Sequence, residues 1–256
     1  MSRPSRICSI ALSLLIVAVL AAACSSGGSG GLRTSTTSAT TDTSSTDTGA
    51  TDTGSSGSLP SEADLKSALL SEDDLPSGFT KDTSSDSSDN SNTDVHAKGA
   101  TCDAAFQKLQ QKATKHKVTV DFKHDDTEFV SQEVAARSDA SSHFTDVLHT
   151  LKDQCGSKVQ LESSGSLKSG TLEVLSDPGI GEHSALIRIT FSGTSQGVDF
   201  TSEGYFVAVQ RGPVTSTIEA YSVSAPRAGV QGTPPDESDA TALAESADSK
   251  IKDLVG

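Results

Sequence analysis

The string Gly193-Thr194-Ser195-Gln196-Gly197 could most directly do chemistry, because Gly-x-Ser-x-Gly presents the nucleophile of many serine hydrolases. That chemistry requires a strand, a sharp turn and then a helix, so that the serine hydroxyl stands exposed at the helix N-terminus. Residues 200–210, which follow the string, instead have the composition of a strand. The same string recurs at Gly27–Gly31 within a stretch of serine and glycine. We therefore interpret residues 193–197 as a hairpin loop, predict no catalytic residue, and expect a protein that is not an enzyme.

Histidine and acidic residues are the other candidates, as ligands of a metal ion. Two histidines on one helical face bind a metal when they are three or four residues apart, whereas His143 and His149 are six apart. His124-Asp125-Asp126 interrupts a strand pattern and is typical of a hairpin turn. The acidic run from Asp86 through Asp89 to Asp94 lacks the glycine and the glutamate of a calcium loop. The sequence therefore predicts no metal site and no cofactor.

The N-terminal residues have the pattern of an export leader. Arg3 and Arg6 give a positive start, and residues 7–23 form an uncharged run that ends in three alanines before Cys24. Small residues directly before a cysteine resemble the bacterial lipobox, in which the thiol receives a diacylglycerol and the leader is then cleaved. We predict that residues 1–23 are a lipoprotein signal peptide and that Cys24 carries the lipid, with palmitate among its acyl chains. The alternative is an ordinary signal peptide cleaved after Ala23, which leaves a free Cys24 thiol.

A lipidated Cys24 would hold the protein on the extracytoplasmic face of the cell membrane, since two or more acyl chains anchor stably. Cleavage removes two of the 20 basic residues and none of the 34 acidic ones, which leaves 18 against 34 and a net charge of −16. A surface this acidic repels phosphate, so we expect no nucleic-acid partner. It also repels anionic lipid headgroups, so membrane contact should come through the anchor alone.

The remaining cysteines indicate a disulfide. Cys8 leaves with the leader and Cys24 is used by lipid, so Cys102 and Cys155 remain as an even pair in an oxidising compartment. A bond between them closes a loop of about 54 residues, which the chain-entropy model values at roughly 4 kcal/mol. Two separate buried thiols are the alternative.

A low-complexity segment follows the lipid site. Of the 34 residues 25–58, 27 are Ser, Thr or Gly, and Thr-Asp-Thr recurs at 41, 46 and 51. Such a segment buries too little apolar surface to offset the entropy of ordering it. We expect residues 24–58 to be a lipidated, disordered tether and residues 59–256 to be the folded domain.

Strand patterns dominate the folded domain. Residues 82–98 are predicted to be a polar, acidic loop. Alternating or β-branched segments predict seven strands, at 118–122, 128–137, 158–163, 170–176, 184–192, 201–210 and 214–223.

Helical patterns frame these strands. Ser61 with Asp64 has the spacing of a capping box, and Cys102 opens a short helical stretch. A longer helix is predicted from Ser138 or Asp139 to Cys155, and a last one from about 238 to 254. Short strands joined by turns favour antiparallel pairing, so we predict one α+β domain with a twisted antiparallel sheet of about five to seven strands, flanking helices and one disulfide.

A set of short motifs is spread over about residues 60–254. It comprises Leu69-Leu70, the turn Leu75-Pro76-Ser77-Gly78-Phe79, Cys102, the stretch Val130–Ala140, Phe144 and Cys155. This set resembles the PknH-like extracellular sensor domain, a family found on mycobacterial receptor kinases and on many actinobacterial lipoproteins. The resemblance implies a domain with a cleft for an unidentified ligand and without enzymatic activity. The family often carries two disulfides, whereas this chain has cysteines for one.

The sequence therefore predicts an actinobacterial cell-envelope lipoprotein that presents a sensor-like, ligand-binding, non-enzymatic domain. Its expected partners are the membrane, through the anchor, and a small ligand or a cell-wall component. A carrier of lipids or other hydrophobic molecules and a protein-interaction module are the alternatives, with a hydrolase the least supported. A closed apolar cavity would favour the carrier, a polar cleft the sensor, and a filled convex domain the interaction module.

Overall fold

The computed structural model describes residues 59–83, 94–104, 116–164 and 167–256. The predicted leader, lipid site and tether lie outside the described residues, as do Asp86, Asp89 and most of the stretch that Cys102 opens. Among the described residues, no helix is both long and apolar enough to cross a bilayer.

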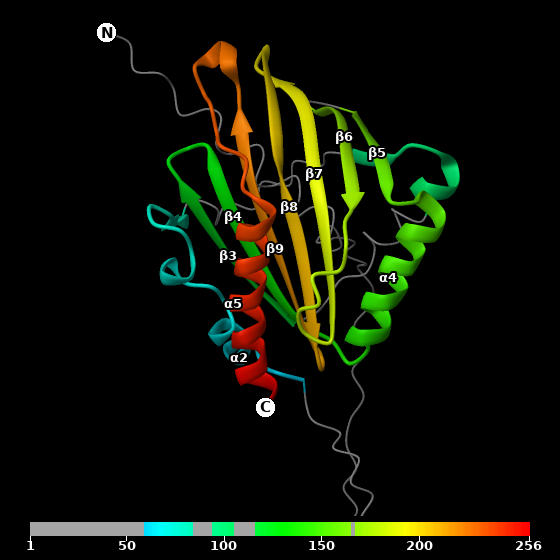
Figure 1. Cartoon of the computed structure of the whole chain (residues 1–256), viewed down its shortest axis with the longest axis vertical. Helices are drawn as coiled ribbons and strands as arrows, with labels where there is room; N and C mark the ends of the chain where they lie inside the picture. The colour runs from blue at the N-terminus through cyan, green and yellow to red at the C-terminus, as the bar shows by residue number, and fades with distance from the viewer. Residues whose placement is uncertain (1–58, 84–93, 105–115, 165–166) are drawn as a thin grey trace, which may run out of the picture. The chain divides into compact units, whose positions relative to one another are not determined.

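An antiparallel sheet of nine strands forms the centre of the domain, in the order β1-β3-β4-β9-β8-β7-β6-β5-β2 (Figure 1). The strands are β1 (Thr80–Lys81), β2 (Asp94–Ala97), β3 (His116–His124), β4 (Glu128–Ala136), β5 (Lys158–Ser164), β6 (Leu167–Val174), β7 (His183–Ser195), β8 (Val198–Arg211) and β9 (Val214–Ser224). The helices are α2 (Glu62–Ser67), α4 (Ala140–Cys155) and α5 (Glu237–Val255), with short 3-10 turns η1 (Glu72–Asp74) and η3 (Pro226–Ala228).

The seven predicted strands are confirmed as β3 to β9, and the α+β class is confirmed with them. The predicted size of the sheet is wrong, because β1 and β2 extend it at its two edges. The predicted loop over 82–98 is also wrong at its end, where Val95 and Ala97 of β2 are buried. Local pattern does not reveal a four-residue strand in an acidic segment, because its stability comes from pairing with the distant β5.

The strands expose alternate residues to two hydrophobic cores. On β8, Val207 and Val209 belong to the core under α5, whereas Phe206 and Ala208 belong to the core that includes α4. Neighbouring residues on a strand point to opposite faces, so α5 and α4 cover opposite faces of the sheet. Figure 1 shows α5 lying along β8 and β9.

Small side chains allow α5 to lie close to the sheet. Ala240, Ala244 and Ala247 are fully buried at a spacing of four and three residues, and Leu243 and Ile251 extend the same stripe. The amphipathic pattern of the last predicted helix is confirmed, and its apolar face covers only part of the strands beneath it.

The predicted disulfide is present between Cys102 and Cys155, with an S–S distance of 2.04 Å. Cys155 is the last residue of α4, and Gly156 follows with a positive φ of 78° that ends the helix. The bond therefore joins the end of α4 to the segment that follows β2. The capping box predicted from Ser61 and Asp64 is also present, at the start of α2.

A buried glutamine fastens the α2 region to the sheet. The Gln132 side chain on β4 is fully buried, and its Oε1 accepts a hydrogen bond from the Leu70 backbone N–H at 2.6 Å. Its Nε2 donates to the Ala68 carbonyl at 3.3 Å and to Ser216 Oγ at 3.0 Å. This one side chain therefore satisfies a backbone donor and a backbone acceptor that have no water to bind.

Replacing Gln132 with Leu should destabilise the domain, because the Leu70 N–H and the Ala68 carbonyl would be buried without partners. Each such group costs about 1–3 kcal/mol, so we expect the free energy of unfolding in urea to fall by at least about 2 kcal/mol. Gln160→Leu, on an exposed position of β5, is the matched control and should change stability little. Equal stability of the two variants would contradict the role assigned to Gln132.

Candidate functional site

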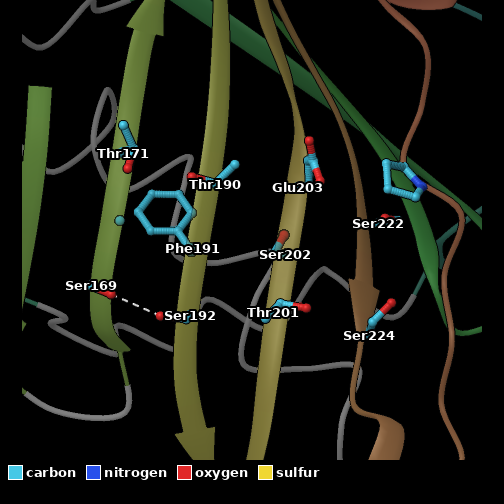
Figure 2. Close-up of a pocket in the computed structure, with 12 residues that line it drawn as sticks. Ser169, Thr171, Thr190, Phe191, Ser192, Thr201, Ser202, Glu203, Ser222 and Ser224 are labelled. Carbon is cyan, nitrogen blue, oxygen red and sulfur yellow. Dashed lines mark hydrogen bonds between the residues drawn. The ribbon is translucent and has the colours of Figure 1, made fainter. Parts of the chain in front are cut away.

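Hydroxyl side chains form two rows across four neighbouring strands, on the face that α5 partly covers. Residues opposite each other in an antiparallel pair share a face, so the register of β6 to β9 places each row. The first row is Ser169, Ser192, Thr201 and Ser224, and the second is Thr171, Thr190, Glu203 and Ser222. Seven of these eight positions therefore carry a hydroxyl, and Figure 2 shows the side chains of both rows.

These rows line a hollow of about 390 Å³. Pro234, in the segment between β9 and α5, also lines it. We call the two rows together with Pro234 the hydroxyl pocket. Its volume lies at the lower end of the range for small-molecule sites.

The wall that contains Pro234 is fixed to the sheet by hydrogen bonds. Ser224 Oγ accepts a bond from the Gly232 N–H at 3.1 Å and donates to the Gly232 carbonyl at 3.3 Å. The Thr233 N–H donates to Glu128 Oε1 at 3.4 Å, and the Ala225 N–H donates to the Val230 carbonyl at 2.9 Å. These bonds therefore fix this wall of the pocket relative to the sheet.

Close packing on the opposite face supports the strands behind the pocket. Gly170 lies beside Phe191, and a Cβ added at position 170 would overlap the Phe191 ring. Because Phe191 is buried in the core that includes α4, the glycine allows that ring to fill the space behind β6. The rows of hydroxyls stand on strands that are well packed from behind.

Charged groups at the two ends of the pocket are paired. Beyond the second row, Arg188 forms an ion pair with Glu203, and this hydrogen bond raises the pKa of the guanidinium. Beyond the first row, Asp199 accepts hydrogen bonds from Lys168 Nζ and Thr194 Oγ1, each at 3.0 Å. The bond from Lys168, above all, lowers the pKa of Asp199.

Arg227 lies 3.6 Å from the same Asp199 carboxylate. Lys168 and Arg227 therefore share one acidic partner, and Glu203 is matched by Arg188. The pocket presents hydroxyls in its middle and ion pairs at its ends, where three cations are paired with two carboxylates.

Three threonine hydroxyls in the pocket are available to a ligand. Ser169 Oγ and Ser192 Oγ bond to each other at 2.9 Å, which Figure 2 marks with a dashed line. The hydroxyls of Thr171, Thr190 and Thr201, by contrast, have no hydrogen-bond partner within the part of the chain that the structure describes. Each hydroxyl can donate one hydrogen bond and accept two, so these side chains can bind polar groups without first breaking a bond inside the protein.

The Gly-x-Ser-x-Gly string lies at the tip of the β7–β8 hairpin, as predicted. Ser195 is the last residue of β7 and pairs with Val198, with Gln196 and Gly197 between them at φ values of 50° and 80°. Two positive φ angles are typical of a tight hairpin turn, and a strand rather than a helix follows. Ser195 therefore lacks the setting of a hydrolase nucleophile.

The His124-Asp125-Asp126 segment also forms the predicted hairpin turn, between β3 and β4, and Asp125 has a φ of 52°. His124 Nδ1 lies 2.9 Å from Glu128 Oε2, and this hydrogen bond raises the pKa of the imidazole. Among the described residues, no group of three or more His, Cys, Asp or Glu side chains is arranged to hold a metal ion.

A second hollow, of about 310 Å³, lies beside the disulfide and is lined by Cys102, Cys155, Lys98 and Lys158 together with their neighbours. Its lysines are exposed, and its lining comes from the segment after β2, the end of α4 and the start of β5. The hydroxyl pocket is built on four paired strands, so we take it as the candidate site.

A buried acid lies on the opposite face of the sheet. Glu219 on β9 is 5% exposed, and its Oε2 has no hydrogen-bond partner within the described residues. Burial, with smaller contributions from the neighbouring Glu133 and Asp121 carboxylates, raises the pKa of Glu219 well above its usual value. The Asp121 carboxylate accepts a bond from Ser131 Oγ at 2.7 Å, and Lys117 Nζ donates to Glu133 Oε2 at 3.0 Å, so the other two acids have partners.

Comparison with protein-family models gave no match, and comparison with curated proteins also gave none. Among solved structures, the chain is similar to the extracellular domain of PknH from Mycobacterium tuberculosis, with a TM-score of 0.44 and 13% sequence identity. The match covers 76% of this chain and 98% of the PknH domain. A likeness at this level carries no argument about family or function, so the family relationship stays a prediction from the sequence motifs.

Sequence reasoning did not find the hydroxyl pocket, although a signal for it exists. Ser169 with Thr171, Thr190 with Ser192, and Ser222 with Ser224 each repeat a hydroxyl with the period of two that places side chains on one strand face. The sequence patterns predict strands at 170–176, 184–192 and 214–223, but they assign no role to the polar faces of these strands. The rows become visible only when the register joins the four strands.

Glu219 should make the folding stability depend on pH. Because burial raises the pKa of this carboxyl in the folded state above that in the unfolded chain, its contribution to stability is present below the unfolded pKa and is lost as the pH rises through the folded pKa. We expect Glu219→Gln to be more stable than the parent at neutral pH and to lose stability less steeply between pH values of about 5 and 8.

Urea unfolding at several pH values measures this difference. Glu245→Gln, which changes an exposed glutamate of α5, is the control and should keep the parental pH slope. A Glu219→Gln slope equal to that of the parent would show that the buried carboxyl does not titrate as described.

Proposed function

We propose that this protein is a lipid-anchored, extracytoplasmic binding protein whose α+β domain takes a polar ligand into the hydroxyl pocket without chemical conversion. The pocket is the observation that carries the proposal. It combines a volume of about 390 Å³ with threonine hydroxyls that lack partners among the described residues. The hydrogen bonds between Ser224 and Gly232 also fix the wall of the pocket that contains Pro234 to β9.

The polarity of this pocket supports a polar ligand over the hydrophobic cargo of a lipid carrier. An apolar molecule in the hydroxyl pocket would bury the hydroxyls without offering them a hydrogen bond, and each unpaired buried polar group costs about 1–3 kcal/mol. The two faces of the sheet are filled by side chains under α5 and α4. These features favour the sensor-like reading of the sequence over the carrier.

The placement outside the cytoplasm rests on the sequence of residues 1–24 and is supported by the disulfide. A Cys102–Cys155 bond persists in oxidising compartments and is rare in the cytosol. The relationship to PknH-like sensor domains, and with it an actinobacterial cell envelope, belongs to the same proposal and rests on the motifs at residues 75–79 and 130–140.

The anchor can be tested with Cys24→Ala. Without the thiol no diacylglycerol can be attached, so the protein should move from the membrane fraction into the soluble extracytoplasmic fraction. Fractionation of host cells followed by immunoblotting measures the distribution, and Cys8→Ala, within the predicted leader, is the control that should leave it unchanged. Membrane retention of the Cys24→Ala protein would contradict lipid anchoring.

The pocket can be tested by native mass spectrometry of protein purified from its host. We expect a co-purified molecule on the parent protein and a loss of most of its occupancy in Ser192→Tyr, because the new ring would fill the middle of the first row. Thr119→Tyr, at an exposed position of β3, is the matched control and should keep the parental occupancy. Equal occupancy in all three proteins, or no bound molecule on the parent, would count against the proposal.

A further inference from the structure

The spacing of the hydroxyl pocket restricts the chemistry of its ligand. Neighbouring strands are about 4.8 Å apart and alternate residues of one strand about 6.8 Å apart, so the two rows form a nearly regular array of hydroxyl groups. The array spans β6 to β9, so a ligand would meet hydroxyls from four strands at once. A molecule that satisfies this array must itself carry many donors and acceptors at short intervals.

The strands around the pocket exclude a peptide that binds by adding a strand. That mode requires the free N–H and C=O groups of a sheet edge. Each of the strands β6 to β9 has a partner on both sides, and at the second row the main chains are paired on both sides, because the β5–β6 ladder includes Thr171 and the β4–β9 ladder includes Ser222. Side-chain hydroxyls are the polar groups that the sheet itself offers there.

The charges around the pocket argue for a ligand without net charge. Lys168 and Arg227 both face Asp199, and Arg188 faces Glu203, so each cation at the rim already has an anionic partner. A ligand carboxylate or phosphate would have to compete with Asp199 or Glu203 for these cations. A cationic ligand would meet the same obstacle at the two carboxylates.

Resting on the proposed function, we infer that the ligand is a neutral carbohydrate, which lies across the two rows and exchanges hydrogen bonds with Thr171, Thr190 and Thr201. Sugar hydroxyls both donate and accept, as the threonine hydroxyls do, so each pair can form in either direction. Pro234 supplies an apolar surface at the wall of the pocket for the C–H groups of a sugar ring. The volume of the pocket suits a short segment of a glycan rather than a large folded partner.

Saturation-transfer-difference NMR on the purified domain tests this inference with named probes. Trisaccharides of glucose, galactose and arabinose are the neutral probes, and the trisaccharide of galacturonate differs from galactotriose in its carboxylates. Oleate serves as the apolar probe. We expect saturation transfer to at least one neutral trisaccharide and weaker transfer to trigalacturonate than to galactotriose. Any saturation transfer to oleate should be the same in the parent and in the Thr171→Val, Thr190→Val double variant.

The double variant Thr171→Val with Thr190→Val removes two hydroxyls from adjacent strands and keeps their shape. Because neither hydroxyl has a bond within the described protein, folding should be unchanged, whereas the affinity for the bound trisaccharide should fall about tenfold or more. Thr119→Val with Thr217→Val makes the same change on the opposite face of β3 and β9 and should leave binding intact.

Three results would overturn the inference: no binding of any neutral trisaccharide, equal binding of trigalacturonate and galactotriose, or equal affinities in the two double variants. These failures are separable from failure of the proposed function. A co-purified molecule that is not a carbohydrate and is lost in Ser192→Tyr would refute the carbohydrate and keep the binding pocket. A co-purified molecule that Ser192→Tyr does not affect would refute both.

Discussion

The register of β7, β8 and β9 is the constraint on which the rest of this structure depends. β7 and β8 pair without interruption from His183 with Gln210 to Ser195 with Val198, and β9 continues the ladder on the other side of β8. A shift by one residue would turn Val207 and Val209 away from α5 and bring Phe206 and Ala208 under it. The same shift of β8 would turn Thr201 and Glu203 to the face that carries α4 and so interrupt both rows. One set of backbone hydrogen bonds therefore fixes both cores and the candidate site.

This coupling explains where the core ends and the pocket begins. Along β9, Ile218 and Ala220 lie in the core under α5, and Ser222 and Ser224 follow on the same face. Along β7, which runs in the same direction as β9, Leu186 gives way to Arg188 and then to Thr190 and Ser192 in the same manner. The face changes from apolar to hydroxylic near the beginning of α5, where no helix among the described residues covers it (Figure 1). The point along β7 and β9 at which apolar residues give way to hydroxyl residues therefore marks how much of this face α5 covers.

The strands that could be predicted from the sequence carry their own periodic pattern. Val118, Val120 and Phe122 alternate with polar residues, and this alternation indicates β3 whatever its neighbours are. The order of the sheet has no such local signal, since β4 pairs with β9 across about 80 residues of chain and β2 joins β5 at the far edge. The two faces of each strand were therefore predictable, but the neighbours that turn single hydroxyls into a pocket were not.

The site also differs from its surroundings in charge, and under the proposed function this difference would favour some ligands over others. The predicted mature chain carries a net charge of −16, which keeps anionic surfaces and polymers away from the domain. At the pocket, Arg188 is paired with Glu203, and Lys168 and Arg227 share Asp199, so each of these cations already has an anionic partner. The electrostatic field of the net charge has little effect on a neutral molecule. At the pocket such a molecule would contact hydroxyls on paired strands, and the entropy cost of ordering those strands is already included in the free energy of folding. An anion would be repelled by the net negative charge as it approached, and at the pocket it would find the cations already paired with carboxylates. Under the proposed function, negative charge over the chain and already paired cations at the pocket would act together to favour uncharged ligands.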